Sequence, residues 1–390
     1  MIEQRTIGVV SCARADFGSL LPVLKQIRSS PLLEEHVYVT GMHLSPEFGM
    51  TVEAVNEQGF ERVERVESLL SSDTPTGIAK SVGLGTVGFA QSFSRFTPDM
   101  LVILGDRFDV LAAAVAALPF NVPIAHLHGG EVTEGAFDEA TRHALTKMSH
   151  LHFTATDTYA RRLKQMGEED WRIVVSGAPG LDNLLEMKPK TKEEVARRFG
   201  FDPTRRILLV TFHPVTIEYQ NTKDHIDELL CALEACGEQT LFTYPNADTA
   251  GRAIIERINR FCAERDGAQV VVNAGQDWYV SLLSCVDGMV GNSSSGIIEA
   301  ASFALPVVNV GIRQRGRLRG PNVDDSGHDR GGIEAAIRRI LAPEFKRRLK
   351  GQGNPYGDGN ASDRIIKRLE GVEIDRRLMV KKFVDRMIEA

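Results

Sequence analysis

The sequence predicts an α/β protein built from two doubly wound, Rossmann-like domains that face each other across a cleft. Short apolar segments, each ended by Gly or a charged residue, alternate with helix-favouring segments along most of the chain. This alternation is typical of strands buried in parallel sheets and joined by helices. The chain has 390 residues, which is too long for one ordinary hydrophobic core and therefore favours two domains.

The first domain is predicted to span residues 1–176. Its strands are expected at residues 6–12, 36–40, 101–104, 122–125, 152–156 and 172–176. Its helices are expected from about residue 19 and at residues 47–58, 77–93, 110–118, 139–149 and 157–166. A Gly-x-Gly-x-x-Gly pattern, Gly83 to Gly88, falls inside one of these helices. Because no strand precedes it, we interpret its glycines as helix-packing residues rather than a dinucleotide fingerprint.

The second domain is predicted to span residues 177–365, beginning at a Gly-rich turn. Its strands are expected at residues 207–212, 240–244, 269–273, 288–291 and 306–310. Its helices are expected at residues 224–236, 249–264 and 299–303. The tail, residues 362–390, has helical apolar periodicity and is predicted to form one amphipathic helix.

Composition excludes several classes of protein. A net charge of −6 argues against a general nucleic-acid binder, because phosphate neutralisation needs a basic surface. The longest apolar stretch, residues 110–125, is broken by Pro119, Asn121 and Pro123, so no membrane span is expected. The five cysteines show no paired spacing, which indicates free thiols in a reducing compartment. With no signal-peptide pattern at the start, we expect a cytoplasmic protein.

Carboxylates follow neighbouring strands of the first domain. Asp106 comes after the strand at 101–104, Glu131 comes after the strand at 122–125, and Asp138 lies before the next helix. Ligands of open α/β sheets bind beyond the carboxyl ends of the strands, and crowded carboxylates suit proton transfer. We therefore predict that these three residues are catalytic, with helix capping as an alternative for Asp138. The cations expected on the same face are Arg14, Arg107, Arg142 and His143.

Two histidines, His126 and His128, precede Glu131. They could bind a metal with it, but the sequence offers no convincing fourth ligand. We interpret them as packing or hydrogen-bonding residues and predict no metal site.

A run of small polar residues follows the strand at 288–291 in the second domain. The run is Asn292, Ser293, Ser294, Ser295 and Gly296. Backbone N–H groups and hydroxyls at the start of a helix form a ready site for a diphosphate, although one serine alone would be an ordinary N-cap. Arg313, Arg315, Arg317 and Arg319 lie on the next strand-end loop and can reach the same anion. His213, after the strand at 207–212, is expected to point into the same cleft as a catalytic residue.

These stretches together resemble the hydrolysing UDP-N-acetylglucosamine 2-epimerases of sialic-acid and related nonulosonate biosynthesis. The stretches that carry the resemblance run in order through most of the chain. They are residues 14–18 (RADFG), 41–43 (GMH), 105–108 (GDRF), 126–131 (HLHGGE), 138–143 (DEATRH), 213–214 (HP), 292–296 (NSSSG) and 311–317.

The resemblance implies a GT-B architecture with residues 366–390 packing back on the first domain as a helix. It implies a homodimer or homotetramer that requires neither nicotinamide nor metal. It also implies that Arg14, His213, Ser294, Ser295 and Glu299 hold the nucleotide and diphosphate, and it adds His43 to the substrate-binding residues. Some relatives carry Tyr where this chain has Phe17 and Phe108, so UDP- or GDP-linked 2,4-diacetamido sugars stand beside UDP-N-acetylglucosamine as substrates.

The reaction expected from the resemblance releases a free N-acetylmannosamine-type sugar and a nucleoside diphosphate, through elimination to a glycal and hydration. Three alternatives remain open from the sequence. The first is a non-hydrolysing epimerase of the same fold, which would return the nucleotide sugar. The second is a GT-B glycosyltransferase, which would need an acceptor. The third is a nucleotide-sugar sensor without turnover.

Overall fold

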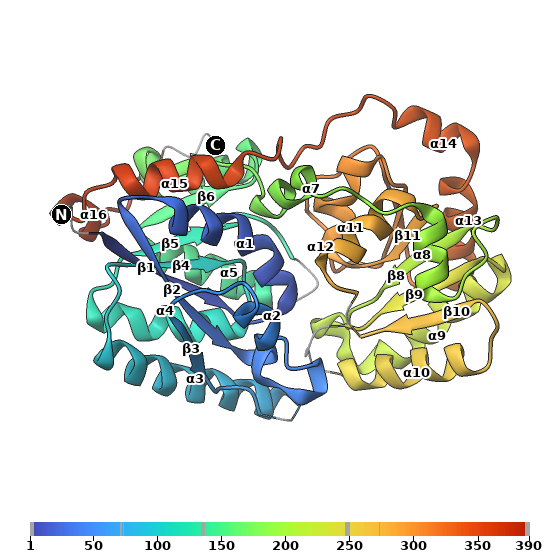
Figure 1. The fold of residues 1–390 in the computed structure, drawn as a ribbon, viewed down its shortest axis with the longest axis horizontal. Helices are drawn as coiled ribbons and strands as arrows, with labels where there is room; N and C mark the ends of the chain where they lie inside the picture. The colour runs from blue at the N-terminus through green and yellow to red at the C-terminus, as the bar shows by residue number, and fades with distance from the viewer. Residues whose placement is uncertain are drawn as a thin grey trace. The chain divides into compact units, whose positions relative to one another are not determined.

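The computed structural model describes residues 4–70, 72, 74–133, 137–245, 250–272 and 274–386. The chain forms two compact units (Figure 1). The first unit contains Met1–Glu131, Asp138–Asn183 and Tyr356–Ala390, and the second contains Val132–Phe137 and Leu184–Pro355.

The boundaries between the units differ from those that we placed at residues 176 and 365. Asp182 stays with the first unit because its carboxylate accepts hydrogen bonds from the backbone N–H of Ala361 (3.0 Å) and of Ser362 (2.6 Å). Tyr356 returns to the first unit ahead of the predicted point, because its buried hydroxyl lies 2.7 Å from that of Tyr159.

The first sheet is entirely parallel in its described residues, with strand order β3-β2-β1-β4-β5-β6-β7. Its strands are β1 (Arg5–Ser11), β2 (Leu33–Thr40), β3 (Val63–Val66), β4 (Met100–Leu104), β5 (Ile124–Leu127), β6 (Leu151–Thr154) and β7 (Ile173–Val175). The chain winds outward from β1 in one direction and from β4 in the other, which makes the β1/β4 junction the switch point of a doubly wound sheet.

The second sheet repeats this plan. Its order is β10-β9-β8-β11-β12-β13, again parallel in the described residues, with the switch point between β8 and β11. Its strands are β8 (Ile207–Thr211), β9 (Gln239–Thr243), β10 (Ala268–Val271), β11 (Gly288–Gly291), β12 (Val307–Val310) and β13 (Val323–Ser326). Asn273, at the end of the strand expected at 269–273, lies outside the described residues.

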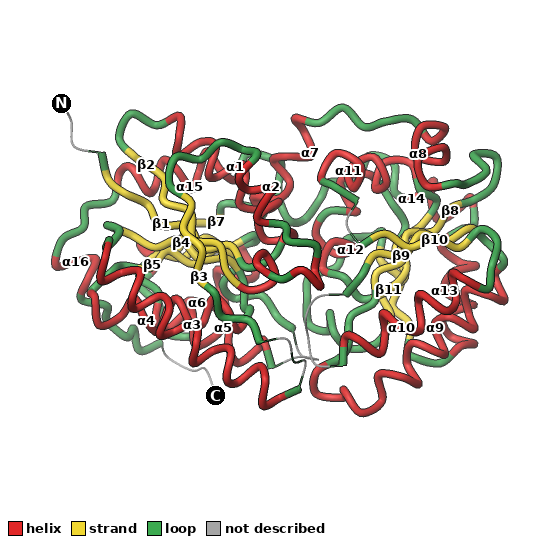
Figure 2. The backbone as a smooth tube through the Cα atoms, turned by 60° about the horizontal axis from the view of Figure 1, so that its bottom comes forward, coloured by secondary structure: helices red, strands yellow, loops and turns green. Residues whose placement is uncertain are grey.

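Helices cover both sheets, and in Figure 2 the strands of each unit lie between them. The first unit contains α1 (Arg14–Ser29), α2 (Val52–Asn56), α3 (Pro75–Arg95), α4 (Phe108–Ala117), α5 (Asp138–Met148), α6 (Asp157–Gln165), α15 (Ala361–Gly371) and α16 (Arg376–Met379). The second contains α8 (Lys192–Phe199), α9 (Thr222–Cys236), α10 (Gly251–Ala263), α11 (Gln276–Cys285), α12 (Ser294–Ile298), α13 (Arg330–Ile340) and α14 (Pro343–Arg348). α7 (Asp182–Glu186) contains the boundary between the units. Short 3₁₀ segments are η1 (Gly41–Leu44), η2 (Pro46–Phe48), η3 (Leu118–Phe120), η4 (Asp170–Arg172), η5 (Pro179–Leu181), η6 (Thr216–Asn221) and η7 (Ala300–Phe303).

Each sheet has an apolar core on both faces, which explains why its strands are continuous apolar runs. In β1, Val9 packs with α1 and α15, whereas Val10 packs with α3 and α4. In β8, Val210 packs with α9 and α13, whereas Leu209 packs with α8 and α11. Among the described residues, no helix combines the length and the apolar character that crossing a membrane requires.

The predicted tail helix is interrupted. α15 ends at Gly371, α16 ends at Met379, and residues 380–386 have no regular structure, while residues 387–390 lie outside the described residues. The buried guanidinium of Arg172 donates hydrogen bonds to the carbonyl oxygens of Arg377 (2.8 Å), Leu378 (2.8 Å) and Val380 (3.2 Å). Because a side chain satisfies these carbonyls, the tail does not need to continue as a helix. The tail packs against the first unit, of which it is a part.

Candidate active site

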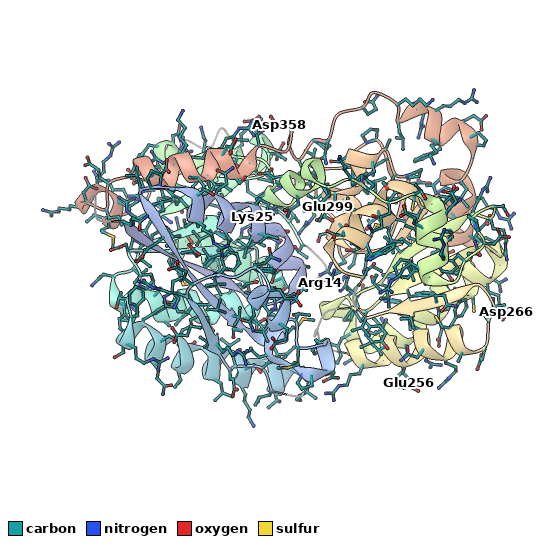
Figure 3. The ribbon with its side chains drawn as sticks, viewed as in Figure 1. Arg14, Lys25, Glu256, Asp266, Glu299 and Asp358 are labelled. Atoms are coloured by element: carbon teal, nitrogen blue, oxygen red, sulfur yellow. The ribbon has the colours of Figure 1, made fainter. Side chains whose placement is uncertain are left out.

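The switch point of the first sheet presents polar residues at the carboxyl ends of β1 and β4. α1 begins at Arg14 (labelled in Figure 3), directly after β1 and several residues before the predicted start. Asp106 and Arg107 follow β4. Because the two strands are neighbours, these three side chains leave the same edge of the sheet, where doubly wound folds bind ligands.

Arg142 connects the turns that follow β4 and β5. Its side chain is only 2% exposed, and it forms an ion pair with Asp106, whose side chain is 17% exposed. It also donates a hydrogen bond to the carbonyl oxygen of His128 at 2.8 Å. A planar guanidinium with several donors suits this double contact better than an ammonium group. Arg142 therefore fixes Asp106 at the edge of the sheet.

The turn after β5 holds Glu131 against His128. The Nδ1 atom of His128 lies 2.5 Å from Oε1 of Glu131, which is buried. His128 has φ +62°, a conformation that a residue with a side chain adopts at a cost of about 1–3 kcal/mol. Gly130 has φ +78°, and a Cβ there would lie 2.6 Å from the carbonyl oxygen of Tyr159. The tight turn therefore directs Glu131 inward and brings it to an imidazole.

His126 and His43 lie behind this edge as neutral, buried residues. His126 donates from Nε2 to the carbonyl oxygen of Gly105 at 2.7 Å, and burial lowers its pKa to about 3. The two ring nitrogens of His43 lie 2.9 Å from the Ser11 hydroxyl and 2.8 Å from the Thr51 hydroxyl, and burial lowers its pKa to about 4. Because His43 is fully buried, we place it behind the site as a positioning residue rather than in contact with substrate.

Two acids at this switch point were not among the predicted site residues, the half-buried Asp16 and the buried Asp109. Asp16 lies in the first turn of α1, where it accepts a hydrogen bond from the Cys12 thiol at 2.9 Å. Asp109 lies in the first turn of α4, 3.4 Å from Arg107. Burial raises the pKa of Asp109 to about 6 and also raises the pKa of Asp16. An acid in the first helical turn after a strand-end loop was the signal that could have found them.

Asp138 is the first residue of α5 and is half-buried. It lies four residues before Arg142, so both side chains leave the same face of the helix. His143, which we expected on this face, lies 3.1 Å from Glu139 of the same helix.

In the second unit, Asn292 joins the loops that follow β8 and β11. Its side-chain oxygen accepts a hydrogen bond from the backbone N–H of His213 at 2.7 Å, and its amide nitrogen donates to the carbonyl oxygen of His213 at 2.8 Å. Its own carbonyl oxygen accepts hydrogen bonds from Arg313 (3.1 Å) and Gln314 (2.9 Å). Asn292 is fully buried and therefore shapes the site rather than exposing an amide to a ligand.

The residues of the serine run contact different partners. Ser293 caps α12 by accepting a hydrogen bond from the backbone N–H of Ser295. The Ser295 hydroxyl accepts from Tyr279 at 2.6 Å and donates to Glu299 (labelled in Figure 3) at 2.5 Å. Ser294 is partly exposed. A Cβ on Gly296 would lie 3.0 Å from Val307, so this glycine allows α12 to pack against β12.

Two arginines of the loop after β12 are engaged within the second unit. Arg317 donates to the carbonyl oxygen of Val132 at 2.8 Å and lies 3.4 Å from the Thr133 hydroxyl. Arg319 pairs with Asp325 at 3.1 Å. Arg315 is exposed.

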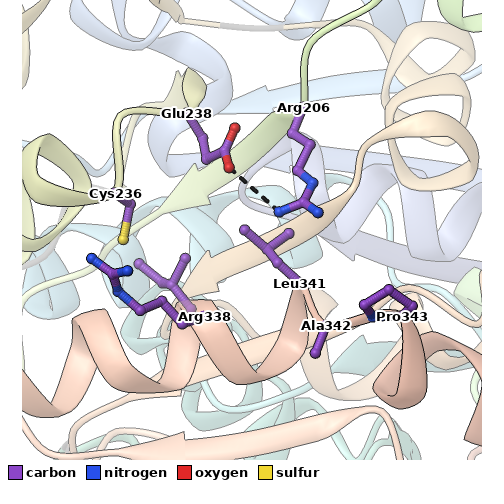
Figure 4. A pocket seen from close by; sticks show the side chains of 8 residues that line it. Arg206, Cys236, Glu238, Arg338, Leu341, Ala342 and Pro343 are labelled. Atoms are coloured by element: carbon purple, nitrogen blue, oxygen red, sulfur yellow. Dashed lines mark ion pairs between the residues drawn. The ribbon is translucent and has the colours of Figure 1, made fainter.

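A pocket in the second unit lies away from these residues (Figure 4). It is lined by Arg206, Cys236, Glu238, Ile337, Arg338, Leu341, Ala342 and Pro343. Arg206 precedes β8 and Glu238 precedes β9, and the two form an ion pair at 3.5 Å. The pocket therefore lies at the amino ends of the strands, opposite to the edge that carries His213 and Asn292.

The structure brings together the predicted residues of each unit at the carboxyl edge of its sheet. In the first unit these are Arg14, Asp106, Arg107, Glu131, Asp138 and Arg142, with His43 behind them. In the second they are His213, Asn292, Ser293, Ser294, Ser295, Gly296, Glu299, Arg313 and Arg317. Both clusters suit polar ligands, and most of the predicted acidic residues lie in the first cluster.

A family model and two similar proteins each match most of the chain. The family model described as UDP-N-acetylglucosamine 2-epimerase matches residues 25–370. The chain is 38% identical over 378 residues to the UDP-N,N'-diacetylbacillosamine 2-epimerase (hydrolyzing) of Legionella pneumophila, covering 97% of this chain and 98% of that one. It is 36% identical over 387 residues to the GDP/UDP-N,N'-diacetylbacillosamine 2-epimerase (hydrolyzing) of Campylobacter jejuni, covering 98% and 100%.

A solved structure supports the fold class. The crystal structure of the Neisseria meningitidis UDP-GlcNAc 2-epimerase bound to UDP-GlcNAc matches with a TM-score of 0.79 at 18% identity, covering 93% of this chain and 99% of that one. The predicted fold class, two Rossmann-like units of the GT-B type, is confirmed.

Proposed function

Because the chain belongs to the UDP-N-acetylglucosamine 2-epimerase family, we propose that it is a hydrolysing 2-epimerase of a nucleotide-linked acetamido sugar. The observation that supports hydrolysis is the identity of 38% and 36%, over nearly the whole chain, to two enzymes named as hydrolysing 2-epimerases. Both act by name on N,N'-diacetylbacillosamine linked to a nucleotide. We therefore favour a 2,4-diacetamido sugar as substrate, with UDP-N-acetylglucosamine as the second substrate to test.

The proposed reaction begins with an elimination. A carboxylate removes the proton from C-2 of the sugar while the bond from C-1 to the diphosphate oxygen breaks, which leaves a C-1–C-2 double bond. The departing electron pair moves onto the diphosphate, where the Ser294 hydroxyl and the Arg313 guanidinium would stabilise the charge. His213, at the end of β8, would contribute to the same nucleotide site.

Hydration then completes the reaction. Water adds at C-1 of the glycal, and a proton returns to C-2 on the opposite face, which gives the free epimerised sugar and the nucleoside diphosphate. Two acid/base groups on different sides of the ring are required, and Asp106, Glu131 and Asp138 are the candidates. The contact between His128 and Glu131 (2.5 Å) supports a role for this pair, because it offers a path for a proton between carboxylate and imidazole.

One experiment tests the proposal directly. The purified chain is incubated separately with UDP-N,N'-diacetylbacillosamine, the GDP-linked form and UDP-N-acetylglucosamine, and products are identified by NMR and mass spectrometry. We expect a free sugar with inverted C-2 and one equivalent of nucleoside diphosphate, formed fastest from a diacetamido substrate. An intact C-2-inverted nucleotide sugar as the end product would favour a non-hydrolysing epimerase. Absence of turnover with all three would contradict the proposal. Light scattering of the same sample tests the predicted homodimer or homotetramer.

A further inference from the structure

Two imidazoles and a carboxylate meet in the second unit outside the residues discussed so far. Glu218 lies in η6, His225 lies in α9, and His328 follows β13. One possible ligand atom from each residue lies within 4.8 Å of those of the other two. The three residues come from elements that are distant in the sequence, so the fold rather than local sequence brings them together.

The ring of His328 is held in place from several sides. It stacks on His225 with ring centroids 3.6 Å apart and planes 3° from parallel, and the ring of Phe212 stands edge-on at 6.4 Å. At Gly311, which has φ +74°, a Cβ would lie 2.1 Å from Cε1 of His328. Only glycine therefore leaves room for this ring.

The ring nitrogens of His328 are buried, and neither has a hydrogen-bond partner among the described residues. Nε2 lies 3.8 Å from Oε2 of Glu218, which is beyond hydrogen-bonding distance. Buried polar groups are normally satisfied, so an imidazole held rigidly beside a carboxylate without a hydrogen bond calls for an explanation.

We propose that Glu218, His225 and His328 bind a divalent transition-metal ion, with Zn²⁺ as the best match. Two imidazoles and one carboxylate, completed by water, form a common zinc ligand set. Tetrahedral ligands at zinc distances lie about 3.4 Å apart. The 3.8 Å separation between Oε2 of Glu218 and Nε2 of His328 is close to this value.

The ion would connect η6, α9 and the loop after β13. η6 begins three residues after His213, so the ion would stiffen the loop that carries this residue. This role is structural and does not depend on the proposed reaction. It is compatible with the prediction that the sugar chemistry itself needs no metal.

The test is direct binding of Zn²⁺ to the whole chain. Chelator-stripped protein is dialysed against Zn²⁺ near neutral pH, and bound metal is counted; Co²⁺ is then used as a spectroscopic probe. We expect one ion per chain, a visible Co²⁺ absorption band and an increase in melting temperature on adding Zn²⁺. His225→Gln and His328→Ala should each weaken binding by roughly a hundredfold or more, since each removes one of only three protein ligands.

The matched control is His143→Ala. His143 lies 3.1 Å from Glu139, so it is also a histidine–carboxylate pair, but one without a second imidazole in the ligand group. This variant should bind Zn²⁺ like the unaltered chain. Circular dichroism checks the fold of each variant, and His225→Gln decides the matter if His328→Ala unfolds, because residue 225 is a partly exposed helix position. No bound Zn²⁺ in the unaltered chain, or unchanged binding in a folded His225→Gln variant, would overturn the proposal.

Discussion

The buried guanidinium of Arg142 pairs with the carboxylate of Asp106 and donates a hydrogen bond to the carbonyl oxygen of His128. One side chain of α5 thus fixes the relative position of the turns after β4 and β5, which carry Asp106 and Glu131. Proton transfer depends on such positions, since a displacement of about 1 Å at a reacting group can cost about a hundredfold in rate.

Arg142→Lys should therefore lower kcat by roughly a hundredfold, because an ammonium group cannot make both planar contacts. The free energy of unfolding should fall by about 1–3 kcal/mol, since a buried hydrogen bond is lost. Steady-state kinetics and urea unfolding measure the two effects. Arg161→Lys on the exposed face of α6 is the control and should change neither. A fully active Arg142→Lys enzyme would show that this connection is not needed for turnover.

The carboxylates themselves are tested by amide substitution. Asp106→Asn and Glu131→Gln should each reduce turnover by roughly a hundredfold or more while nucleoside diphosphate still binds, because each change removes proton transfer but preserves shape. Asp138→Asn should have a smaller effect if its main role is at the start of α5. Kinetics and calorimetric titration with UDP separate chemistry from binding. Near-normal rates in both of the first two variants would mean that the acids act elsewhere.

Asp109 should make stability depend on pH. Its folded pKa of about 6 lies above the ordinary value of 3.8, so folding favours the protonated form. Its stabilising contribution is complete below about pH 3.8 and is lost as the pH rises through about 6. Relative to Asp109→Asn, the unaltered chain should therefore lose up to about 3 kcal/mol of unfolding free energy between pH 4 and pH 7. Urea unfolding of both proteins across this range measures the difference, and a constant difference would contradict the prediction.

Most of the fold follows from the alternation of buried strands and helices, and the two strands that were not predicted share a physical reason. β3 (VERV) and β13 (VDDS) are edge strands, and both are only partly buried. An edge strand needs little apolar sequence, so no apolar run identified either one. The break in the predicted tail helix could not be predicted from the tail sequence, because it depends on Arg172, which lies about two hundred residues earlier.

The sequence also predicts the candidate site only in part. Strand-end motifs locate Asp106, Glu131, His213 and Asn292 correctly on the carboxyl edges of the two sheets. They do not show that the side-chain amide of Asn292 forms hydrogen bonds with the backbone of His213. These bonds form only because the two loops meet in the folded structure.

The nucleotide site is tested by two substitutions in the second unit. Arg313→Ala should weaken UDP binding by roughly tenfold or more, because a charge-assisted hydrogen bond to an anion is lost. Ser294→Ala should weaken it less, because a neutral hydroxyl contributes less. Calorimetric titration measures both. Arg260→Ala, which changes an exposed arginine of α10 in the same unit, is the matched control and should keep normal affinity. Equal affinities in all four proteins would place the nucleotide elsewhere.

Isotopes test the order of bond breaking at C-2 and C-1. If the C-2 proton is removed as the diphosphate departs, the proton that returns comes from an acid that exchanges with solvent. The sugar released in heavy water should then carry one deuterium at C-2. Water labelled with heavy oxygen should place its label at C-1, because hydration of the glycal and not cleavage at phosphorus supplies that oxygen. NMR and mass spectrometry read both labels. Product that retains the original hydrogen at C-2 would exclude the elimination, and label found in the nucleoside diphosphate would mean that water attacked phosphorus instead.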